Sequence, residues 1–315
     1  MSAPQSGAAA AAAREQGQGR CPVCGGAGRH AFTATDRNRR ISDEPFAYER
    51  CESCATVFLA TPPADPGRYY GAGYHPFGAD GEPAWKADPA LLAAERWRAQ
   101  KLHALAGGGR LVDIGAGAGG FAAAAAEAGF AVTAIEMDRE CCEWMERRLG
   151  VSAICTDRPL DALAGLPPSR VVTIWHALEH LPDTAGVLAA AAAALEAGGL
   201  LALAIPNSDS LQFRTLRARW AHLDAPRHVS LPGADALLTA ARRVGLTPVF
   251  ETTSDPSALA CNLHGWVYAL RRDPSQGAAK GLPLRAGSWL TAALGPVEHR
   301  ARNGAALTLV LRKTA

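Results

Sequence analysis

Three features are missing from this sequence of 315 residues, and each absence narrows what the protein can be. No run approaches the roughly 18 consecutive apolar residues of a membrane span. No basic start precedes an apolar stretch, as a secretory signal requires, because Arg14 and Arg20 follow the alanines. The net charge of +2 is far from the strongly basic balance that phosphate-neutralising proteins have. We therefore expect a cytoplasmic protein without a membrane partner, and the charge disfavours nucleic acid.

The composition, with 48% hydrophobic and 20% charged residues, is that of a globular protein with one sizeable core and a smaller unit. Residues 1–20 are mostly Ala, Gln and Gly. Such a segment cannot bury enough apolar surface to offset its chain entropy. We expect it to be a disordered tail.

Four of the eight cysteines form two CxxC pairs with 26 residues between them. Two residues between cysteines let both thiolates of a tight turn bind one ion, and two such turns complete a tetrahedral zinc site. Redox pairs and metal-free thiols are the alternatives, but a redox motif needs only one pair. We expect a structural Zn²⁺ ion in a zinc ribbon over residues 21–60, because four sulfurs leave no open position for substrate. Its ligands would be Cys21, Cys24, Cys51 and Cys54.

The segment LVDIGAGAGGF, residues 111–121, joins a short apolar run to the alanine-rich stretch FAAAAAEAG. A buried strand, a glycine turn and a helix in this order form the nucleotide-binding corner of a doubly wound sheet. Asp113 ends the strand, and Glu136 ends the next strand about 20 residues later, where an acid can bind ribose hydroxyls. A tight turn in another kind of α/β protein is the alternative.

The pattern DxGxGxG followed by this acid resembles class I S-adenosylmethionine-dependent methyltransferases. The resemblance implies an α/β fold with a doubly wound, Rossmann-like sheet of seven strands. It implies that Gly115, Gly117 and Gly119 pass beneath the methionine part of the cofactor and that Glu136 binds its ribose. Asp113 would help to hold the amino-acid end, and Met137 would pack against the adenine.

The resemblance covers residues 107–252 and resumes at residues 306–313, which would form a last, antiparallel strand. Asp157 resembles the acid near the adenine amino group, with Asp161 as the alternative. In VVTIWHALEHLPD, a buried strand ends at Trp175, which we expect beside the cofactor, and the segment after it resembles one that crosses the cofactor cleft. We expect the following helix to run to Ala197.

The rest of the chain completes the expected domain organisation. Residues 61–106 would be a linker or lid and a helix, and residues 107–315 the methyltransferase domain, with substrate-covering insertions at 207–232 and 253–304. With the ribbon, the chain resembles bacterial zinc-ribbon methyltransferases of sugars or other small metabolites. In RYYGAGYHPF, the candidates for substrate contact are Tyr69, Tyr70 and Tyr74, which could instead pack the ribbon against the main domain.

A hydroxyl or acidic C–H acceptor needs a base, and histidine suits neutral pH. Of nine histidines, we choose His228 first and His180 second, with His176 and His222 as further candidates. His176 and His180 follow the fourth expected strand on the cleft side, and His222 and His228 lie in the loop after the fifth. Capping or packing of the next helix would also explain His180, and loop hydrogen bonding would also explain His228. Near His228, Asp224 and Arg227 could orient the imidazole or bind an anionic substrate. In the second insertion, His264 and Trp266 could meet substrate, but core or homodimer packing is the preferred explanation.

The leading functional hypothesis is methylation of a small molecule, a sugar or specialised metabolite, at oxygen or carbon. The sequence IPN departs from the PPY-type motif of amino methylators, which disfavours nitrogen. One alternative is an RNA methyltransferase whose ribbon binds RNA, since arginines at 214, 217, 219, 227, 242 and 243 could form a basic face. Another is a non-catalytic scaffold or partner subunit, although a scaffold has no need of an open glycine turn.

Overall fold

The computed structural model describes residues 19–70, 77–78, 81–275, 280–300 and 302–314. Tyr74 and residues 1–18 of the expected tail lie outside these ranges. Among the described residues, no helix is both long enough and apolar enough to cross a membrane.

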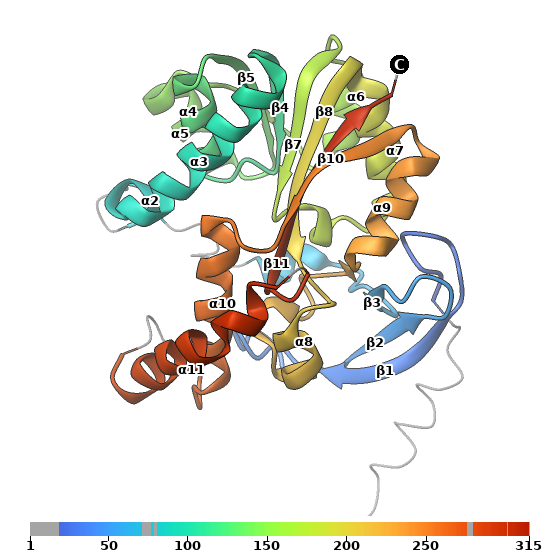
Figure 1. Cartoon of the computed structure of the whole chain (residues 1–315), viewed down its shortest axis with the longest axis vertical. Coiled ribbons are helices and arrows are strands. Elements are labelled where there is room, and N and C mark those ends of the chain that lie inside the picture. The colour runs from blue at the N-terminus through green and yellow to red at the C-terminus, as the bar shows by residue number, and fades with distance from the viewer. Residues whose placement is uncertain (1–18, 71–76, 79–80, 276–279, 301, 315) are drawn as a thin grey trace, which may run out of the picture.

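The main sheet has seven strands in the order β10-β11-β8-β7-β4-β5-β6 (Figure 1). β4 to β8 run parallel to one another, whereas β11 is antiparallel to both β8 and β10. The expected seven-stranded, Rossmann-like sheet with an antiparallel last strand is confirmed. Its strands are β4 (Gly109–Ile114), β5 (Phe130–Glu136), β6 (Ser152–Cys155), β7 (Ser169–Trp175), β8 (Leu195–Pro206), β10 (Leu246–Thr252) and β11 (Ala306–Lys313).

Helices cover both faces of this sheet because alternate strand residues point in opposite directions. Leu111 and Val171 pack on one face with helices α3 and α4, whereas Val112 and Val172 pack on the other with α6, α7 and α9. The central strands β4 and β7 therefore pack apolar residues on both faces. The helices are α3 (Pro89–Ala106), α4 (Gly120–Glu127), α5 (Arg139–Trp144), α6 (Pro159–Ala164), α7 (Thr184–Ala194) and α9 (Ala234–Arg243). A π-helical turn, η2 (Met145–Leu149), continues α5.

Helix α7 ends earlier than the sequence predicts. It begins after Asp183, whose side chain caps the helix by accepting from the Gly186 amide, and it ends at Ala194. The expected end at Ala197 is wrong, because Leu195 already has extended backbone (φ −82°, ψ 144°) and pairs with Ser169 of β7. The alanines favour helix, but pairing with the sheet decides the boundary.

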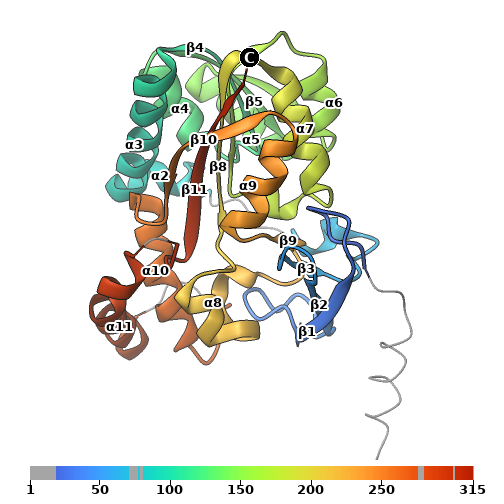
Figure 2. The same cartoon turned by 45° about the vertical axis from the view of Figure 1, so that its right-hand side comes forward.

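The cysteine-containing segment forms a second, antiparallel sheet in the order β1-β2-β3-β9 (Figure 2). Its first three strands are β1 (Gly28–Ala34), β2 (Phe46–Cys51) and β3 (Val57–Leu59). The fourth, β9 (Ser230–Leu231), comes from the insertion at 207–232. Tyr48 of β2 shares a core with Phe213 and Trp220 of that insertion. The ribbon is thus packed into the rest of the protein.

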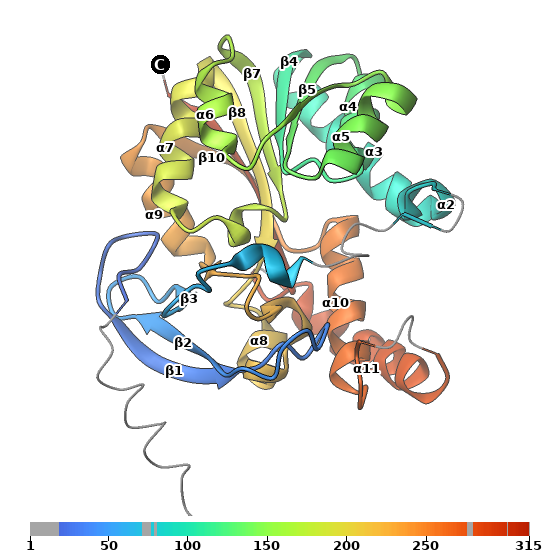
Figure 3. The same cartoon turned by 180° about the vertical axis from the view of Figure 1, so that it is seen from behind.

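The two insertions lie below the main sheet beside the ribbon (Figure 3). The first contains α8 (Leu211–Leu216), η4 (Arg217–Arg219) and η5 (Ala221–Leu223), and the second contains α10 (Pro256–Ala269) and α11 (Leu282–Glu298). Trp266 is buried between these helices, where its indole N–H donates to Glu298 Oε1 at 2.9 Å. Two short elements, η1 (Pro66–Tyr69) and α2 (Ala84–Ala87), precede α3.

Candidate functional site

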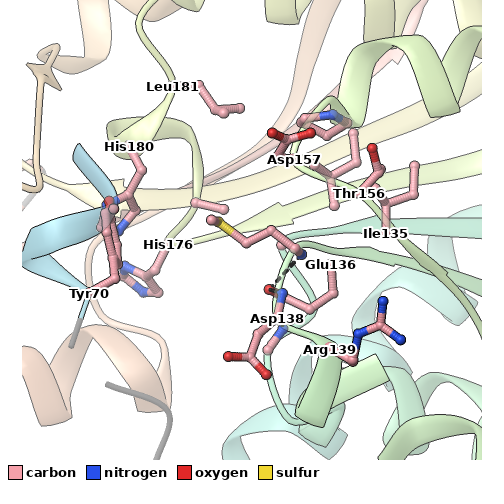
Figure 4. A pocket seen from close by; sticks show the side chains of 17 residues that line it. Tyr70, Ile135, Glu136, Asp138, Arg139, Thr156, Asp157, His176, His180 and Leu181 are labelled. Carbon is pink, nitrogen blue, oxygen red and sulfur yellow. Dashed lines mark hydrogen bonds between the residues drawn. The ribbon is translucent and has the colours of Figure 1, made fainter. Parts of the chain in front are cut away.

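A cavity of about 510 Å³ opens where β4, β5, β6 and β7 end. Figure 4 shows its two sides. One side carries residues at the ends of β5 and β6, among them Glu136 and Asp157. The other carries His176 and His180, which follow β7, together with Tyr70. A ligand in this cavity would therefore contact the ends of several parallel strands, where ligands of doubly wound sheets bind.

The glycine turn between β4 and α4 gives bare backbone to the cavity at Gly115 and Gly117. At Gly117 the φ angle is +54°, and a Cβ atom would point into open space. At Gly115 a Cβ atom would lie 2.5 Å from Cβ of Ala177, so the glycine lets the segment after β7 approach. Gly119 does not line the cavity, because its neighbour is the Met145 side chain.

Glu136 is buried at the end of β5, and backbone amides fix its carboxylate. Oε2 accepts from the Gly117 amide at 2.7 Å, and Oε1 accepts from the amides of Met137 and Asp138 at 2.8 and 2.9 Å. A carboxylate has about four acceptor sites, and three are occupied by these amides, so one site on Oε2 is left to accept from a ligand hydroxyl. Its position at the cavity wall suits the expected contact with ribose.

Asp113 lies in β4 and is buried beneath the residues that line the cavity. Its Oδ1 accepts from the Thr173 hydroxyl at 2.7 Å, while Oδ2 is buried without a hydrogen-bond partner among the described residues. Burial raises the pKa of this carboxyl to about 7. An orphaned buried acceptor calls for a donor that the protein does not supply. A cationic or amino-bearing ligand, directly or through water, would supply it.

Two more expected cofactor residues line the cavity and one does not. Met137 exposes 57% of its surface there, as a residue packing on a flat ring would. Asp157 lines the same side, whereas Asp161 is exposed and pairs with Arg158. Trp175 lies outside the cavity, with its ring between Phe121 and the Arg98 guanidinium.

Two of the four candidate histidines line the cavity. His176 has a positive φ of 52°, and its imidazole is one-third exposed, with Nε2 3.4 Å from Arg98 Nη2 and Nδ1 3.7 Å from Glu179 Oε1. Strained backbone of this kind gathers at functional sites. His180 contacts Tyr70 through Nδ1, which is 2.8 Å from the hydroxyl oxygen. Burial, reinforced by the charge of His228, lowers the pKa of His180 to about 4.

The other two candidate histidines, His228 and His222, lie behind His180, away from the cavity. The His228 ring is 4.6 Å from that of His180, and its Nδ1 is 2.8 Å from the His222 carbonyl oxygen. His222 donates through Nε2 to the carbonyl of Cys261 at 2.8 Å, and burial lowers its pKa to about 3. Neither residue lines the cavity, so either would reach a ligand only through His180 or after a rearrangement.

Glu179 is the main site residue that sequence reasoning missed. It is 1% exposed, and its Oε2 has no hydrogen-bond partner within the described part of the chain. Burial alone would raise its pKa, but His176 and His228 beside it outweigh burial and hold the pKa below its usual value. The available signal was an acid adjacent to a histidine in HALEH, directly after a buried strand.

Asp224 and Arg227 lie away from the cavity. The side chain of Arg227 is completely buried, and it donates to Asp224 and to Asp36, which follows β1. Burial opposes its charge, but the two carboxylates outweigh this and raise its pKa. Tyr69 is also buried and bonds Glu44, whereas Tyr70 faces the cavity. In this arrangement Arg227 has no face left for a substrate.

The four cysteines converge as the spacing predicts. Cys21 Sγ and Cys54 Sγ are 3.6 Å apart, Cys24 Sγ and Cys51 Sγ are 3.4 Å apart, and all four lie within 4.8 Å of one another. Zn–S bonds of about 2.3 Å place tetrahedral sulfurs about 3.8 Å apart, so the set fits zinc after a small expansion. Both turns are built alike, since the fifth residue of each donates its amide to the carbonyl of the first cysteine.

Comparisons with known proteins agree with this geometry. The methyltransferase domain family matches residues 87–251, which is 165 of the 315 residues. The ubiquinone biosynthesis O-methyltransferase of Bordetella pertussis is 31% identical over 152 residues, which are 45% of this chain and 63% of that protein. The match thus covers less than two thirds of that curated relative.

Solved structures share the fold. A proposed sarcosine dimethylglycine methyltransferase from Galdieria sulphuraria superposes with a TM-score of 0.51 at 17% identity, covering 71% of this chain and 86% of that one. An S-adenosylmethionine-dependent methyltransferase from Archaeoglobus fulgidus gives a TM-score of 0.49 at 16% identity, covering 72% and 96%. At 17% identity, the likeness to the Galdieria sulphuraria protein shows the fold alone.

Proposed function

This chain belongs to the family of class I S-adenosylmethionine-dependent methyltransferase domains, and we propose that it transfers the cofactor's methyl group to oxygen or carbon of a small molecule. The supporting observation is that one cavity has a side suited to the cofactor and an opposite side suited to an acceptor. Residues after β5 and β6 suit an adenosine, and residues after β7 offer imidazoles to an acceptor. We propose a sugar or specialised metabolite as acceptor, as in the zinc-ribbon methyltransferases that the sequence resembles.

The cofactor side of the cavity is proposed to work by fixed hydrogen-bond acceptors. Glu136 would accept from a ribose hydroxyl, Asp157 from the adenine amino group, and Asp113 Oδ2 from the ammonium of the methionine part, with Met137 against the adenine. When bound, the cofactor supplies an electrophilic methyl group on a sulfonium, whose displacement leaves a neutral thioether. The protein's main task is then to align donor and acceptor.

The acceptor side needs a group that removes a proton. We propose His176 as this base, because it lines the cavity, is the most exposed of the three neighbouring imidazoles, and has Glu179 next to its Nδ1 to stabilise an imidazolium. His180 is a weaker base near neutral pH because burial lowers its pKa to about 4. His228 and His222 stay predicted candidates that this cavity does not contact.

Calorimetric titration of the purified protein with S-adenosylmethionine and with its demethylated product tests the proposal. We expect both to bind, and we expect Glu136→Ala to weaken them about tenfold or more, as loss of hydrogen bonds to a charged group does. Glu127→Ala is the matched control, because Glu127 is an exposed glutamate at the end of α4 and does not line the cavity. Thermal unfolding of each variant checks that it is folded. Equal affinity in Glu136→Ala and wild type would contradict the cofactor placement.

A further inference from the structure

We infer that Glu179, His180 and His228 hold a divalent transition-metal ion beside the cofactor cavity, at a site separate from the four cysteines. Each of these side chains offers one ligand atom, and the three atoms lie within 4.8 Å of one another. Glu179 and His180 come from η3 (Leu178–His180), directly after β7, and His228 comes from the insertion at 207–232.

The spacing between Glu179 and His228 favours an ion over a direct hydrogen bond. Glu179 Oε1 is 4.0 Å from His228 Nε2, whereas a hydrogen bond would need about 2.7 to 3.2 Å. Two ligands about 2.1 Å from one ion can be at most about 4.2 Å apart. The distance between these two atoms is therefore too long for a hydrogen bond but is compatible with both atoms binding one metal ion. Closing the three ligand atoms around the ion requires side-chain shifts of about an ångström.

Both histidines are oriented as metal ligands usually are. His228 Nδ1 is 2.8 Å from the His222 carbonyl oxygen, and His180 Nδ1 is 3.1 Å from the Arg227 carbonyl oxygen. A carbonyl can only accept, so His228 Nδ1 donates its proton there and His228 Nε2 keeps a lone pair. His180 Nδ1 can donate to the Arg227 carbonyl in the same way, with the Tyr70 oxygen as a second acceptor, and in that tautomer its Nε2 also keeps a lone pair. Metal-binding histidines almost always donate their other ring N–H to a carbonyl or carboxylate in this way. The Tyr70 hydroxyl, 2.8 Å from the same His180 nitrogen, adds a contact on the cavity side.

Glu179 supplies the second, independent observation. It is 1% exposed, yet its Oε2 is buried without a hydrogen-bond partner among the described residues. A buried carboxylate oxygen that lacks a hydrogen-bond partner is costly, and a metal ion is one group that would compensate it. Neighbouring imidazoles are too far for hydrogen bonds, since His176 Nδ1 is 3.7 Å from Oε1. An ion at this carboxylate would compensate its charge directly.

The ligand set indicates which ion and which role. Two imidazoles and one carboxylate suit Zn²⁺, Mn²⁺, Co²⁺ or Fe²⁺ better than Mg²⁺ or Ca²⁺, which prefer oxygen ligands. Three protein ligands leave positions open, and His180 lines the cavity, so an acceptor hydroxyl there could become a further ligand. A bound ion of this kind lowers the pKa of such a hydroxyl.

The role of the ion, though not its binding, rests on the proposed function. In that reaction the hydroxyl proton passes to His176, and an oxygen lone pair forms the bond to the methyl carbon. The electron pair of the broken carbon–sulfur bond stays on sulfur. His180 and His228 then act as ligands, and His176 remains the base.

Calorimetric titration with Mn²⁺, Co²⁺ and Zn²⁺, on protein that already carries one zinc per chain at the cysteines, tests the inference. We expect one further equivalent to bind to the wild type, and we expect Glu179→Gln and His228→Gln each to weaken it at least tenfold. His264→Gln is the matched control, because the His264 ring lies 5.2 Å from that of His222 but His264 is not part of the set. Elemental analysis of each protein gives the stoichiometry.

Binding of no ion beyond the cysteine-held zinc would overturn the inference, as would equal affinity in both variants and the wild type. If circular dichroism shows that one variant is unfolded, the other decides. S-adenosylmethionine is titrated separately into the same samples. A protein that binds the cofactor but no second ion refutes this site alone, whereas one that binds the ion but no cofactor refutes the proposed function and leaves the site standing.

Discussion

Arg227 and Asp36 form an ion pair whose two side chains are both completely buried, with 2.6 Å between Nη2 and Oδ1. Asp36 lies in the loop between β1 and β2 of the cysteine-containing sheet, and Arg227 precedes His228 in the loop behind the cavity. A second contact links the same two parts, because the Tyr48 hydroxyl donates to the His228 carbonyl at 3.0 Å. The cysteine-containing sheet therefore supports the loop that carries the inner histidine.

Asp36→Asn should be strongly destabilising. Removing one charge leaves the Arg227 guanidinium buried with a single remaining carboxylate, Asp224, and breaking a buried pair typically costs about 3 to 5 kcal/mol. The free energy of unfolding from denaturant titration measures this cost. Because Arg227 keeps Asp224, we expect a value near the lower end of that range.

The control for Asp36→Asn is Glu127→Gln, which breaks the exposed pair between Glu127 and Arg96. Exposed pairs contribute roughly 0 to 1 kcal/mol, so this change should be close to neutral. Equal effects of the two substitutions would show that the buried pair does not tie the ribbon to the loop.

Much of the fold follows from local sequence because its signals are short-range. Each element is indicated by residues within it, namely the glycines after Asp113, the apolar runs of the strands and the alanines of the helices. The alternation of strands and helices then predicts a doubly wound sheet. The predicted end of α7 at Ala197 was wrong because the pairing of Leu195 with β7 overrides helix propensity. The pairing of β9 with β3 was out of reach, since two residues 170 positions away carry no local strand signal.

The candidate site was only partly predictable for the same reason. Glu136 and Asp157 follow strands at fixed places in a recognisable pattern, and both line the cavity. Arg227 looked available for substrate, but its partner Asp36 is 191 residues away and only the folded chain reveals it. Glu179 lies within a recognised segment, yet its importance comes from burial beside His228, which a linear sequence does not show.

Removal of zinc should unfold the ribbon and loosen the loop behind it. We expect Cys24→Ser to lose the metal, because three sulfurs and a hydroxyl bind zinc less well than four sulfurs. Wild-type protein should contain one zinc per chain at these cysteines by elemental analysis, and the variant close to none. The variant should also unfold at a lower denaturant concentration.

Cys155→Ser is the matched control for the zinc site, since Cys155 is an exposed cysteine on β6 outside the four-sulfur set. Its zinc content and stability should equal those of the wild type. A fully stable Cys24→Ser protein without metal would mean that the cysteines hold the ribbon together as thiols alone.

Asp157→Asn should weaken cofactor binding, whereas Asp161→Asn should not. Asp157 lines the cavity and is proposed to accept from the adenine amino group, and loss of a hydrogen bond to a charged group costs about 1.5 to 3 kcal/mol. The dissociation constant should rise about tenfold or more by calorimetry. Asp161 is exposed and pairs with Arg158, so its amide variant is the control. The opposite ranking would move the adenine contact from Asp157 to Asp161.

Cofactor affinity should depend on pH through Asp113. Burial raises its pKa to about 7, so the carboxyl is largely neutral at pH 6 and largely ionised at pH 8. A cationic ligand prefers the ionised form, and affinity should therefore rise with pH through this range. If binding lowers this pKa by one unit, the gain between pH 6 and pH 8 is about fivefold.

Asp113→Asn separates this effect from titration of the cofactor's own amino group, which both proteins experience alike. The ratio of wild-type to variant affinity should rise about fivefold from pH 6 to pH 8 in calorimetric titrations. The same raised pKa has the opposite consequence for folding. Between about pH 4 and 7 the unfolded chain ionises Asp113 while the native state keeps the proton, so wild-type stability falls with rising pH relative to the variant. If the ratio of wild-type to variant cofactor affinity stays constant from pH 6 to pH 8, the Asp113 carboxylate does not interact with the bound cation.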